Sequence, residues 1–116
     1  MFYPATIISN CKNKMQIVQE EVFGSVLSVI EFGKFEEAIE LANVSKYGLT
    51  SSIYTNNLPK AFKVVDYLEF REPYINRENL EAIQGCHTGS KHSGFGGADG
   101  KHDLEEYLRT YILNNL

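Results

Sequence analysis

Two cysteines, Cys11 and Cys86, are candidates for a disulfide or a metal site. They are too few for a disulfide framework, and neither has a second cysteine at the spacing of metal ligands. His87 follows Cys86 directly, but one such pair cannot complete a tetrahedral site. We therefore interpret both cysteines as reduced thiols and predict no metal site.

Carboxylates stand beside an aromatic residue in Glu20-Glu21-Val22-Phe23-Gly24, where an expected helix meets an expected strand. Taken alone, this segment is typical of solvated glutamates and a core phenylalanine. Scattered histidines in a loop are more often surface residues than ligands, and without geometry none identifies a catalytic group. The polar residues in or near the long loop of the second half are Glu81, His87, Lys91, His92 and His102.

A glycine-rich run from Gly94 to Lys101 invites comparison with phosphate-binding loops. The dinucleotide fingerprint G-x-G-x-x-G, started at Gly94, requires glycine where Asp99 stands. A P-loop ending at Gly100-Lys101 requires serine or threonine where His102 stands. Neither motif is present, so we expect these glycines to allow positive φ angles and close approach of neighbouring backbone.

The composition bounds the class of protein. A length of 116 residues suits one domain but not two, and a hydrophobic fraction of 43% is ordinary for a soluble protein. The net charge of -4 provides no basic field, so we expect no nucleic-acid or membrane partner. No apolar run approaches the ~20 residues of a membrane span. The first residues have no signal-peptide pattern, and we therefore expect a cytoplasmic protein.

Hydrophobic patterns alternate between strand and helix in the first half. The β-branched run Ala5–Ser9 predicts a strand, and apolar residues at helical spacing predict a helix over Met15–Val22. Val26–Phe32 is nearly all apolar, which is typical of a strand covered on both faces. An amphipathic helix is expected to begin at Phe35, because apolar residues lie on one face of it and glutamates on the other.

The second half continues this alternation and then loses its periodicity. Asn57 and Pro59 are signals for the start of a helix. Residues 77 to 100 are expected to form a long loop, and a loop of this length in a compact domain is usually functional or held by other contacts. Strands alternating with helices indicate an α/β fold with a parallel sheet, which needs cover on both faces. The further elements that we expect are strands at 49–54, 73–76 and 109–113, and a helix at 103–108.

Glu20 to Val26 reads E-E-V-F-G-S-V, and further motifs follow it along the chain. These motifs resemble those of the NAD(P)-dependent aldehyde dehydrogenase superfamily: Glu20 to Val26 is similar to its E-E-x-F-G-P-V motif, and the later segments match in family order. Residues 75–85 and 96–102 resemble the lactaldehyde/glycolaldehyde dehydrogenase branch of that family. The later matching segments are Phe35–Ile39, Leu41–Asn43, Tyr47–Thr50, Tyr74–Asn76, Lys91–Gly96 and Leu104–Tyr107.

The resemblance implies a role for two residues in binding NAD or NADP. Glu21 matches the glutamate that accepts hydrogen bonds from the nicotinamide ribose hydroxyls. Phe23 matches the aromatic residue that packs beside the nicotinamide ring. Both are expectations carried over from the family.

The resemblance also implies a substrate site and an assembly segment. The loop 77–87 matches a wall of the aldehyde pocket, in which Glu81 and His87 match residues that bind the substrate hydroxyl. Residues 1–108 match the C-terminal part of the catalytic domain, a partial parallel sheet. Residues 109–116 match the C-terminal oligomerisation strand that joins a neighbouring subunit's sheet.

The sequence departs from the family pattern in the residues that perform the reaction. The reaction uses a cysteine thiolate, a water-activating glutamate and a Rossmann-like cofactor domain, all N-terminal in the family to the matched region. Neither Cys11 nor Cys86 matches the family's G-Q-x-C nucleophile segment. Ser25 replaces the proline of the motif, and Pro73 stands in an expected strand, where it removes a sheet donor.

These observations leave three hypotheses. The first is a C-terminal part of an aldehyde dehydrogenase that oxidises a small hydroxyaldehyde such as lactaldehyde and is inactive alone. The second is half of a split enzyme that acts with a separate N-terminal chain. The third is a non-enzymatic module that self-associates through unpaired sheet edges, giving a homo-oligomer.

Overall fold

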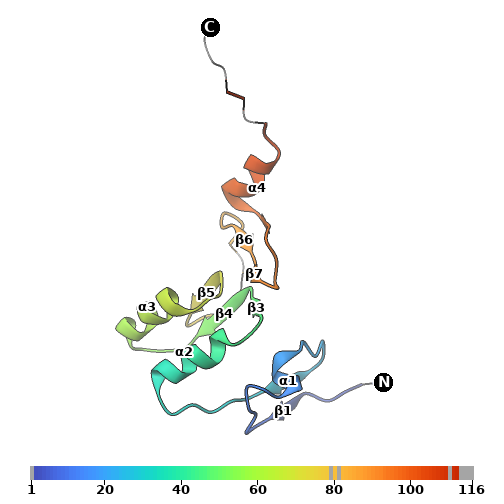
Figure 1. The fold of residues 1–116 in the computed structure, drawn as a ribbon, viewed down its shortest axis with the longest axis vertical. Coiled ribbons are helices and arrows are strands. Elements are labelled where there is room, and N and C mark those ends of the chain that lie inside the picture. Colours follow the sequence, from blue (N-terminus) through green and yellow to red (C-terminus); the bar gives the residue numbers. More distant parts are fainter. Residues whose placement is uncertain (1, 79, 81, 110, 113–116) are drawn as a thin grey trace. The chain divides into compact units, whose positions relative to one another are not determined.

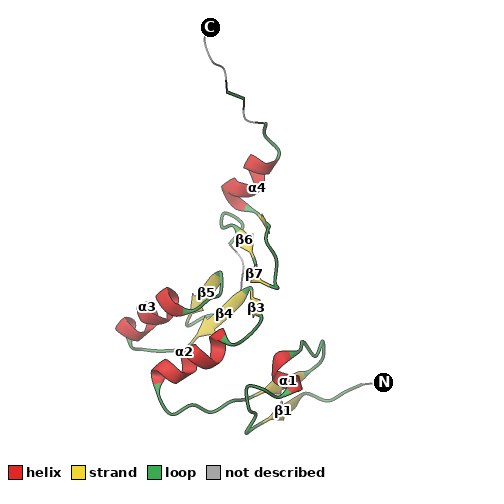
Figure 2. Ribbon diagram, viewed as in Figure 1, coloured by secondary structure: helices red, strands yellow, loops and turns green. Residues whose placement is uncertain are grey.

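The computed structural model describes residues 2–78, 80, 82–109 and 111–112. The chain forms two compact units, Met1–Lys46 and Tyr47–Leu116. Each unit combines short strands with helices, as Figures 1 and 2 show. The further division into a catalytic part, 1–108, and an oligomerisation strand, 109–116, stays a prediction.

The first unit is a small strand–helix–strand arrangement followed by a second helix. Strand β1 (Thr6–Ile8) pairs in parallel with β2 (Val26–Ser28), in the register that places Thr6 opposite Val26 and Ile8 opposite Ser28. The connection between the two strands contains α1 (Gln16–Gln19), and α2 (Phe35–Asn43) follows β2. The parallel pairing expected from the alternating pattern is confirmed.

Two elements of this unit are shorter than expected. Helix α1 ends at Gln19 because Glu20 is extended, with φ of -114° and ψ of 146°. Strand β2 ends at Ser28, although the Val29 N–H still donates to the Ile8 carbonyl at 2.8 Å. The partner strand determines this length, since β1 stops at Ile8 and Asn10 takes a positive φ of 57°.

Helix α2 begins where the sequence predicts. The Glu37 carboxylate accepts hydrogen bonds from the N–H groups of Gly33 at 2.8 Å and Lys34 at 3.3 Å. Carboxylates in the first turn also interact favourably with the helix dipole, and Glu36 and Glu37 both lie there. This local chemistry explains why the helix start could be read from the sequence.

The second unit is built on a second parallel pair. Strand β4 (Thr50–Ile53) leads through α3 (Leu58–Tyr67) to β5 (Glu72–Ile75), and the two strands pair from Thr50–Glu72 to Ile53–Ile75. Asn57 caps α3, since its side-chain oxygen accepts from the Lys60 N–H at 3.0 Å. The strand, the helix and its cap confirm the expected elements.

Pro73 fits inside β5 for a geometric reason. The N–H groups of Glu72 and Asn76 donate to the carbonyls of Leu49 and Ile53. Backbone donors alternate in direction along a strand, so the nitrogen of Pro73 faces away from β4. The missing donor therefore costs no hydrogen bond of this pairing.

The described residues of the loop from 77 to 100 include three short strands that the sequence did not predict. They are β6 (His87–Thr88), β7 (Ser90–Lys91) and β8 (Gly97–Ala98). Strand β6 pairs antiparallel with β8, and β7 pairs antiparallel with β3 (Tyr47–Gly48). Pairings between distant two-residue segments leave no periodicity in the sequence.

The end of the chain differs in part from expectation. Helix α4 (Gly100–Glu106) begins three residues before the expected start at Asp103. Of the expected strand 109–113, the described residues Arg109, Tyr111 and Ile112 lie in no helix or strand. Residues 110 and 113 lie outside the described residues, and a strand that joins another subunit needs that subunit, so this expectation stays untested.

Few apolar side chains are buried among the described residues. The buried hydrophobic residues are Cys11 in the first unit and Ala61 and Val64 of α3 in the second. Ile7 and Leu27, which are opposite each other in β1 and β2, are 72% and 60% exposed. A parallel sheet needs cover on both faces, and the described residues leave this apolar surface of β1 and β2 exposed.

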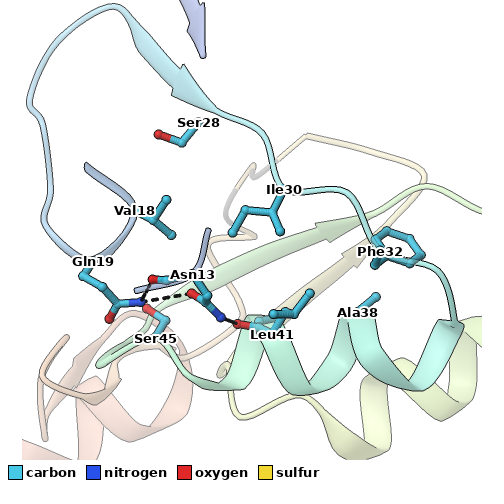
Figure 3. A pocket seen from close by; sticks show the side chains of 10 residues that line it. Asn13, Val18, Gln19, Ser28, Ile30, Phe32, Ala38, Leu41 and Ser45 are labelled. Carbon is cyan, nitrogen blue, oxygen red and sulfur yellow. Dashed lines mark hydrogen bonds between the residues drawn. The ribbon is translucent and has the colours of Figure 1, made fainter. Parts of the chain in front are cut away.

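The first unit also has an apolar hollow of about 330 Å³ beside α2. Figure 3 shows Val18, Ile30, Phe32, Ala38 and Leu41 around it. Polar side chains at its rim are hydrogen-bonded to one another and to the backbone. The Asn13 side chain donates to the Leu41 carbonyl at 2.7 Å and accepts from the Gln19 side chain at 3.0 Å. These hydrogen bonds connect Asn13 to α1 and α2 at the rim of the hollow.

Asn76 connects the end of β5 to the end of β4. Its side-chain oxygen accepts from the Thr55 N–H at 2.8 Å, and its side-chain nitrogen donates to the Thr55 carbonyl at 2.8 Å. The backbone of Asn76 has a φ of 54°, a conformation that asparagine tolerates better than most residues. Asn76 thereby sets the direction in which the loop 77–100 leaves the sheet.

We predict that Asn76→Ala loosens this junction more than Asn76→Gly. Both variants lose the hydrogen bonds to Thr55, worth about 1–3 kcal/mol together. Alanine also suffers left-handed strain of about 1–2 kcal/mol, which glycine does not. Amide hydrogen exchange at residue 76, whose N–H donates to the Ile53 carbonyl in both variants, measures the effect. Equal protection in the two variants would contradict the role of the positive φ.

Candidate functional site

The segment between α1 and β2 contains the two residues expected to contact a nicotinamide cofactor. Glu21 is exposed and lines an open hollow of about 370 Å³ with Gln16, Ile17, Glu20 and Val22. The neighbouring carboxylate of Glu20 accepts a hydrogen bond from the Gln16 side chain at 2.9 Å. Exposure leaves the Glu21 carboxylate accessible to a diol, which such a group can bind through both hydroxyls.

Phe23 has an unusual backbone. Its φ is 48° and its side chain is 89% exposed. A bulky residue with positive φ is an outlier, since left-handed geometry costs roughly 1–2 kcal/mol. Strain of this kind is concentrated at ligand-binding sites. The positive φ of Phe23 is therefore compatible with the expected ligand contact, which stays a prediction.

The second unit contains a cavity of about 230 Å³ beside β5. Residues of β5 form one side and the first part of the loop 77–100 forms the other. The cavity is smaller than the roughly 300–1,000 Å³ usual for sites of drug-sized ligands, so its size suits a molecule of a few heavy atoms. Its lining includes Glu72, Tyr74, Arg77, Leu80, Cys86 and His87.

His87 is tied to β5 by a short polar contact. Its Nδ1 lies 2.6 Å from Oε1 of Glu72, and the two side chains are only 27% and 17% exposed. The other carboxylate oxygen of Glu72 accepts a hydrogen bond from the Tyr74 hydroxyl at 2.6 Å. Sequence reasoning named His87 but missed Glu72 and Tyr74. Their i, i+2 spacing in a strand, which places both on one face, was the only signal available.

The glycine-rich run supports the backbone of His87. His87 pairs with Ala98 and Thr88 with Gly97. A Cβ atom at Gly97 would lie 2.7 Å from Thr88 Cβ and 2.9 Å from the His87 carbonyl oxygen. The close approach expected for these glycines is confirmed at this position, where only glycine lets β8 reach β6.

The remaining polar residues named from the sequence make other contacts. The amine of Lys91 lies 2.7 Å from a Glu69 carboxylate oxygen and 5.9 Å from the Phe70 ring centre. His92 lies edge-on to Tyr47 at 6.4 Å, and an exposed His102 nitrogen lies 3.8 Å from Glu105. Glu81 lies outside the described residues, so its expected role stays a prediction.

Besides the contact between His87 and Glu72, a hydrogen bond holds the loop 77–100 near its first residues. The Tyr54 hydroxyl donates a very short hydrogen bond to the Glu78 carboxylate. That hydrogen bond raises the pKa of Tyr54 above its usual range, with smaller contributions from desolvation and from the negative charge of Glu78. The phenol is therefore stabilised in its protonated form, which links the end of β4 to the loop.

No group of three or more His, Cys, Asp or Glu side chains comes together to hold a metal ion among the described residues. Likewise, no helix within the described part of the chain has the length and apolar character to cross a membrane.

The whole chain, apart from its last residues, matches the profile of one protein family. The profile described as "Aldehyde dehydrogenase family" aligns with residues 1–112. This chain belongs to the aldehyde dehydrogenase family. The resemblance drawn from ordered motifs is confirmed, and so is the aldehyde dehydrogenase fold with its parallel strand pairs.

Comparison with individual aldehyde dehydrogenases shows what share of their length this chain covers. Lactaldehyde dehydrogenase of Escherichia coli (strain K12) is 54% identical over 112 residues, covering 97% of this chain and 23% of the relative. The crystal structure of Escherichia coli lactaldehyde dehydrogenase superposes with a TM-score of 0.92 at 55% identity, covering 97% of this chain and 24% of that chain. The chain thus spans about a quarter of the length of the aldehyde dehydrogenases it matches.

Two further aldehyde dehydrogenases name a cofactor. Betaine aldehyde dehydrogenase of Staphylococcus aureus, solved in complex with NAD+, superposes with a TM-score of 0.88 at 42% identity, covering 91% of this chain and 21% of that chain. D-glyceraldehyde dehydrogenase (NADP(+)) of Thermoplasma acidophilum is 39% identical, covering 93% of this chain and 22% of the relative. The names of these similar proteins therefore include NAD+ for one and NADP+ for the other.

We predict that Gly97→Ala disturbs His87, whereas Gly96→Ala does not. Alanine at position 97 clashes with backbone and Cβ atoms of β6, which must shift. Position 96 has nothing within 4 Å of an added Cβ, so it is the matched control. Side-chain NMR signals of His87 report the change. Equal shifts in both variants would show that the close approach is unimportant.

We also predict that Glu78→Gln lowers the pKa of Tyr54 toward its ordinary value near 10. Because the folded-state pKa is raised, the contact contributes stability below about pH 10 and loses it as pH rises through the folded-state value. The difference between tyrosine absorbance titrations of the parent and Tyr54→Phe isolates this group. Glu105→Gln is the control, and an unchanged curve in Glu78→Gln would refute the assignment.

Proposed function

We propose that this chain supplies part of the cofactor and substrate sites of an NAD(P)-dependent aldehyde dehydrogenase. The reaction is the oxidation of a small hydroxyaldehyde, such as lactaldehyde, to the acid. Glu21 and Phe23 contact the nicotinamide end of the cofactor, and His87 with Glu81 binds the substrate hydroxyl. The small cavity beside β5, with His87 in its wall, is the observation on which this proposal rests.

The similarity to lactaldehyde dehydrogenase supports the choice of substrate. Its 54% identity extends over 97% of this chain and so includes the loop that lines the cavity. A polar side chain in a small cavity favours a substrate with a hydroxyl, because an analogue without it leaves the polar group unpaired. The proposed substrate class is therefore a short 2-hydroxyaldehyde.

The residues present fit one end of a nicotinamide cofactor. An exposed carboxylate at Glu21 suits a ribose diol, and the exposed ring of Phe23 offers a flat apolar surface. When bound, the nicotinamide accepts the hydride that leaves the substrate carbon. Glu21 orients the ribose, and Phe23 limits how far the ring can move.

We propose that the 116-residue chain has no dehydrogenase activity by itself. Cys11 is only 3% exposed, and its thiol lies 3.3 Å from the Ile8 carbonyl, as expected of an inert structural cysteine. Cys86 lies in the cavity wall next to Gly97, but its sequence context differs from the family's nucleophile segment. Acyl transfer in this family begins with a cysteine thiolate, so activity requires that cysteine from polypeptide outside these 116 residues.

The test is to assay the purified chain with lactaldehyde and either NAD+ or NADP+. We expect no turnover from the chain alone. Addition of a polypeptide with the family's nucleophile and cofactor-binding segments should restore it. In the restored enzyme, His87→Ala should lower kcat/KM for lactaldehyde about 10–100-fold and hardly affect propanal, because one hydrogen bond is lost.

His102→Ala is the matched control, because that exposed histidine contacts Glu105 and does not line the cavity. It should leave both kcat/KM values unchanged. Turnover by the isolated chain, or an equal effect of His87→Ala on both aldehydes, would overturn the proposal.

The exposed apolar faces support a second candidate, a self-associating module. Ile7 and Leu27 on the β1–β2 pair and the hollow in Figure 3 present apolar surface that a second copy could cover. Sedimentation velocity distinguishes the two candidates. A stable homo-oligomer that rejects the complementing polypeptide favours self-association, and a stable monomer disfavours it.

A further inference from the structure

The wall of the cavity beside β5 contains the positively charged side chain of Arg77. This arginine is the second residue after β5, and it lines the cavity together with residues of the loop that follows. A guanidinium stays charged in proteins and presents its N–H donors in a planar fork. The cavity therefore combines a volume of about 230 Å³ with a permanent positive charge in its wall.

The contacts of Arg77 leave most of this fork unused. Its Nη2 donates to the Leu80 carbonyl at 3.3 Å, a long hydrogen bond to a neutral acceptor. The guanidinium carbon lies 5.4 Å from the centre of the Tyr74 ring, whose face restrains the side chain. These are the contacts that the guanidinium makes with the described residues, and neither supplies a negative charge.

The two described carboxylates close to Arg77 in the sequence interact with other residues. Glu78 accepts a hydrogen bond from the Tyr54 hydroxyl. Glu72 also lines the cavity, but each of its oxygens already lies 2.6 Å from a neighbouring side chain of the cavity wall. Within the described part of the chain, the guanidinium therefore faces the cavity without a carboxylate paired to it.

A small ligand with a carboxylate matches this arrangement. The two oxygens of a carboxylate accept parallel N–H bonds from a guanidinium, and such charge-assisted pairs are stronger than hydrogen bonds between neutral groups. Leu80 and Ala82, which also line the cavity, offer apolar surface to a short carbon chain. The cavity therefore suits a short carboxylic acid in both charge and size.

We propose that Arg77 binds the carboxylate of a short 2-hydroxy acid in this cavity. Such an acid is the product of the oxidation proposed above, so the identity of the ligand as product rests on the proposed function. The binding of a short carboxylate by Arg77 does not rest on it, because it follows from the guanidinium and the cavity alone.

Arg77 then distinguishes the product from the substrate. The aldehyde is neutral and gains no charge-assisted pair, whereas the acid gains one. Because both molecules are assigned to the same cavity, bound acid excludes the next aldehyde. Arg77 therefore determines how strongly the acid inhibits the reaction that forms it.

The test is an NMR titration of the full 116-residue chain with lactate at neutral pH, where lactate is ionised. The backbone amides of Ala82 and Gly85, which line the cavity, report binding. We expect saturable shifts in the parent chain. The dissociation constant should rise roughly five- to tenfold in Arg77→Gln, since Arg77 is exposed and solvent weakens the pair. Arg77→Lys should show a smaller rise, because it keeps the charge but loses the fork.

Arg71→Gln is the matched control, because it removes the same charge from an exposed arginine that does not line the cavity. Its dissociation constant should equal that of the parent chain. No saturation up to about 100 mM lactate in the parent, or an unchanged constant in Arg77→Gln, overturns the proposal. If Arg77→Gln displaces the loop, seen as shifted amides before lactate is added, an unchanged constant in Arg77→Lys overturns it instead.

A second arm, a titration with propanoate, separates this proposal from the proposed function. Propanoate keeps the carboxylate of lactate and lacks its hydroxyl. We expect Arg77→Gln to weaken both acids by the same factor, and lactate to bind several-fold more tightly than propanoate. Equal affinities for the two acids, with both still weakened in Arg77→Gln, would overturn hydroxyl binding in the cavity and support the role of Arg77. Tighter binding of lactate that Arg77→Gln leaves unchanged would do the reverse.

Discussion

The parallel pairing of β4 with β5 is the constraint on which the second unit depends. Four residue pairs in register, from Thr50–Glu72 to Ile53–Ile75, determine where β5 begins and which way its side chains point. The pairing brings Thr55 next to Asn76, whose side chain closes the junction through two hydrogen bonds of 2.8 Å. It also places Glu72 and Tyr74 together on one face. A slip of one residue would turn both to the opposite face and remove the contact with His87.

The residues expected to bind ligands lie on both closely packed and strained backbone. His87 is fixed by short strands whose close packing admits only glycine at position 97. Phe23, by contrast, is an exposed aromatic residue with a positive φ of 48°. Backbone in that region costs roughly 1–2 kcal/mol, which the surrounding structure must offset. The two features lie in different units, and each is determined by contacts within its own unit.

The small buried core sets a limit on what the chain does alone. Burial of apolar surface is the main stabilising term in folding, at roughly 25 cal/mol per Å². Only Cys11, Ala61 and Val64 are buried hydrophobic residues among those described, whereas Ile7 and Leu27 remain mostly exposed. The chain spans about a quarter of the length of its aldehyde dehydrogenase relatives. Both facts support a function that needs polypeptide outside these 116 residues.

The sequence by itself determined the family and the elements whose signals are local. The family was identified from ordered motifs, each of which is a few residues long. The starts of α2 and α3 could be predicted because the glutamates of α2 and the Asn57 cap of α3 interact with backbone only a few residues away. Tertiary structure alone decided the length of β2, the short strands in the loop 77–100 and the contact between Glu72 and His87. These depend on partners 9 or more residues away, or on the point where a neighbouring strand ends. Hydrophobic periodicity reports which face of an element is apolar, but it does not specify which distant residue will meet it.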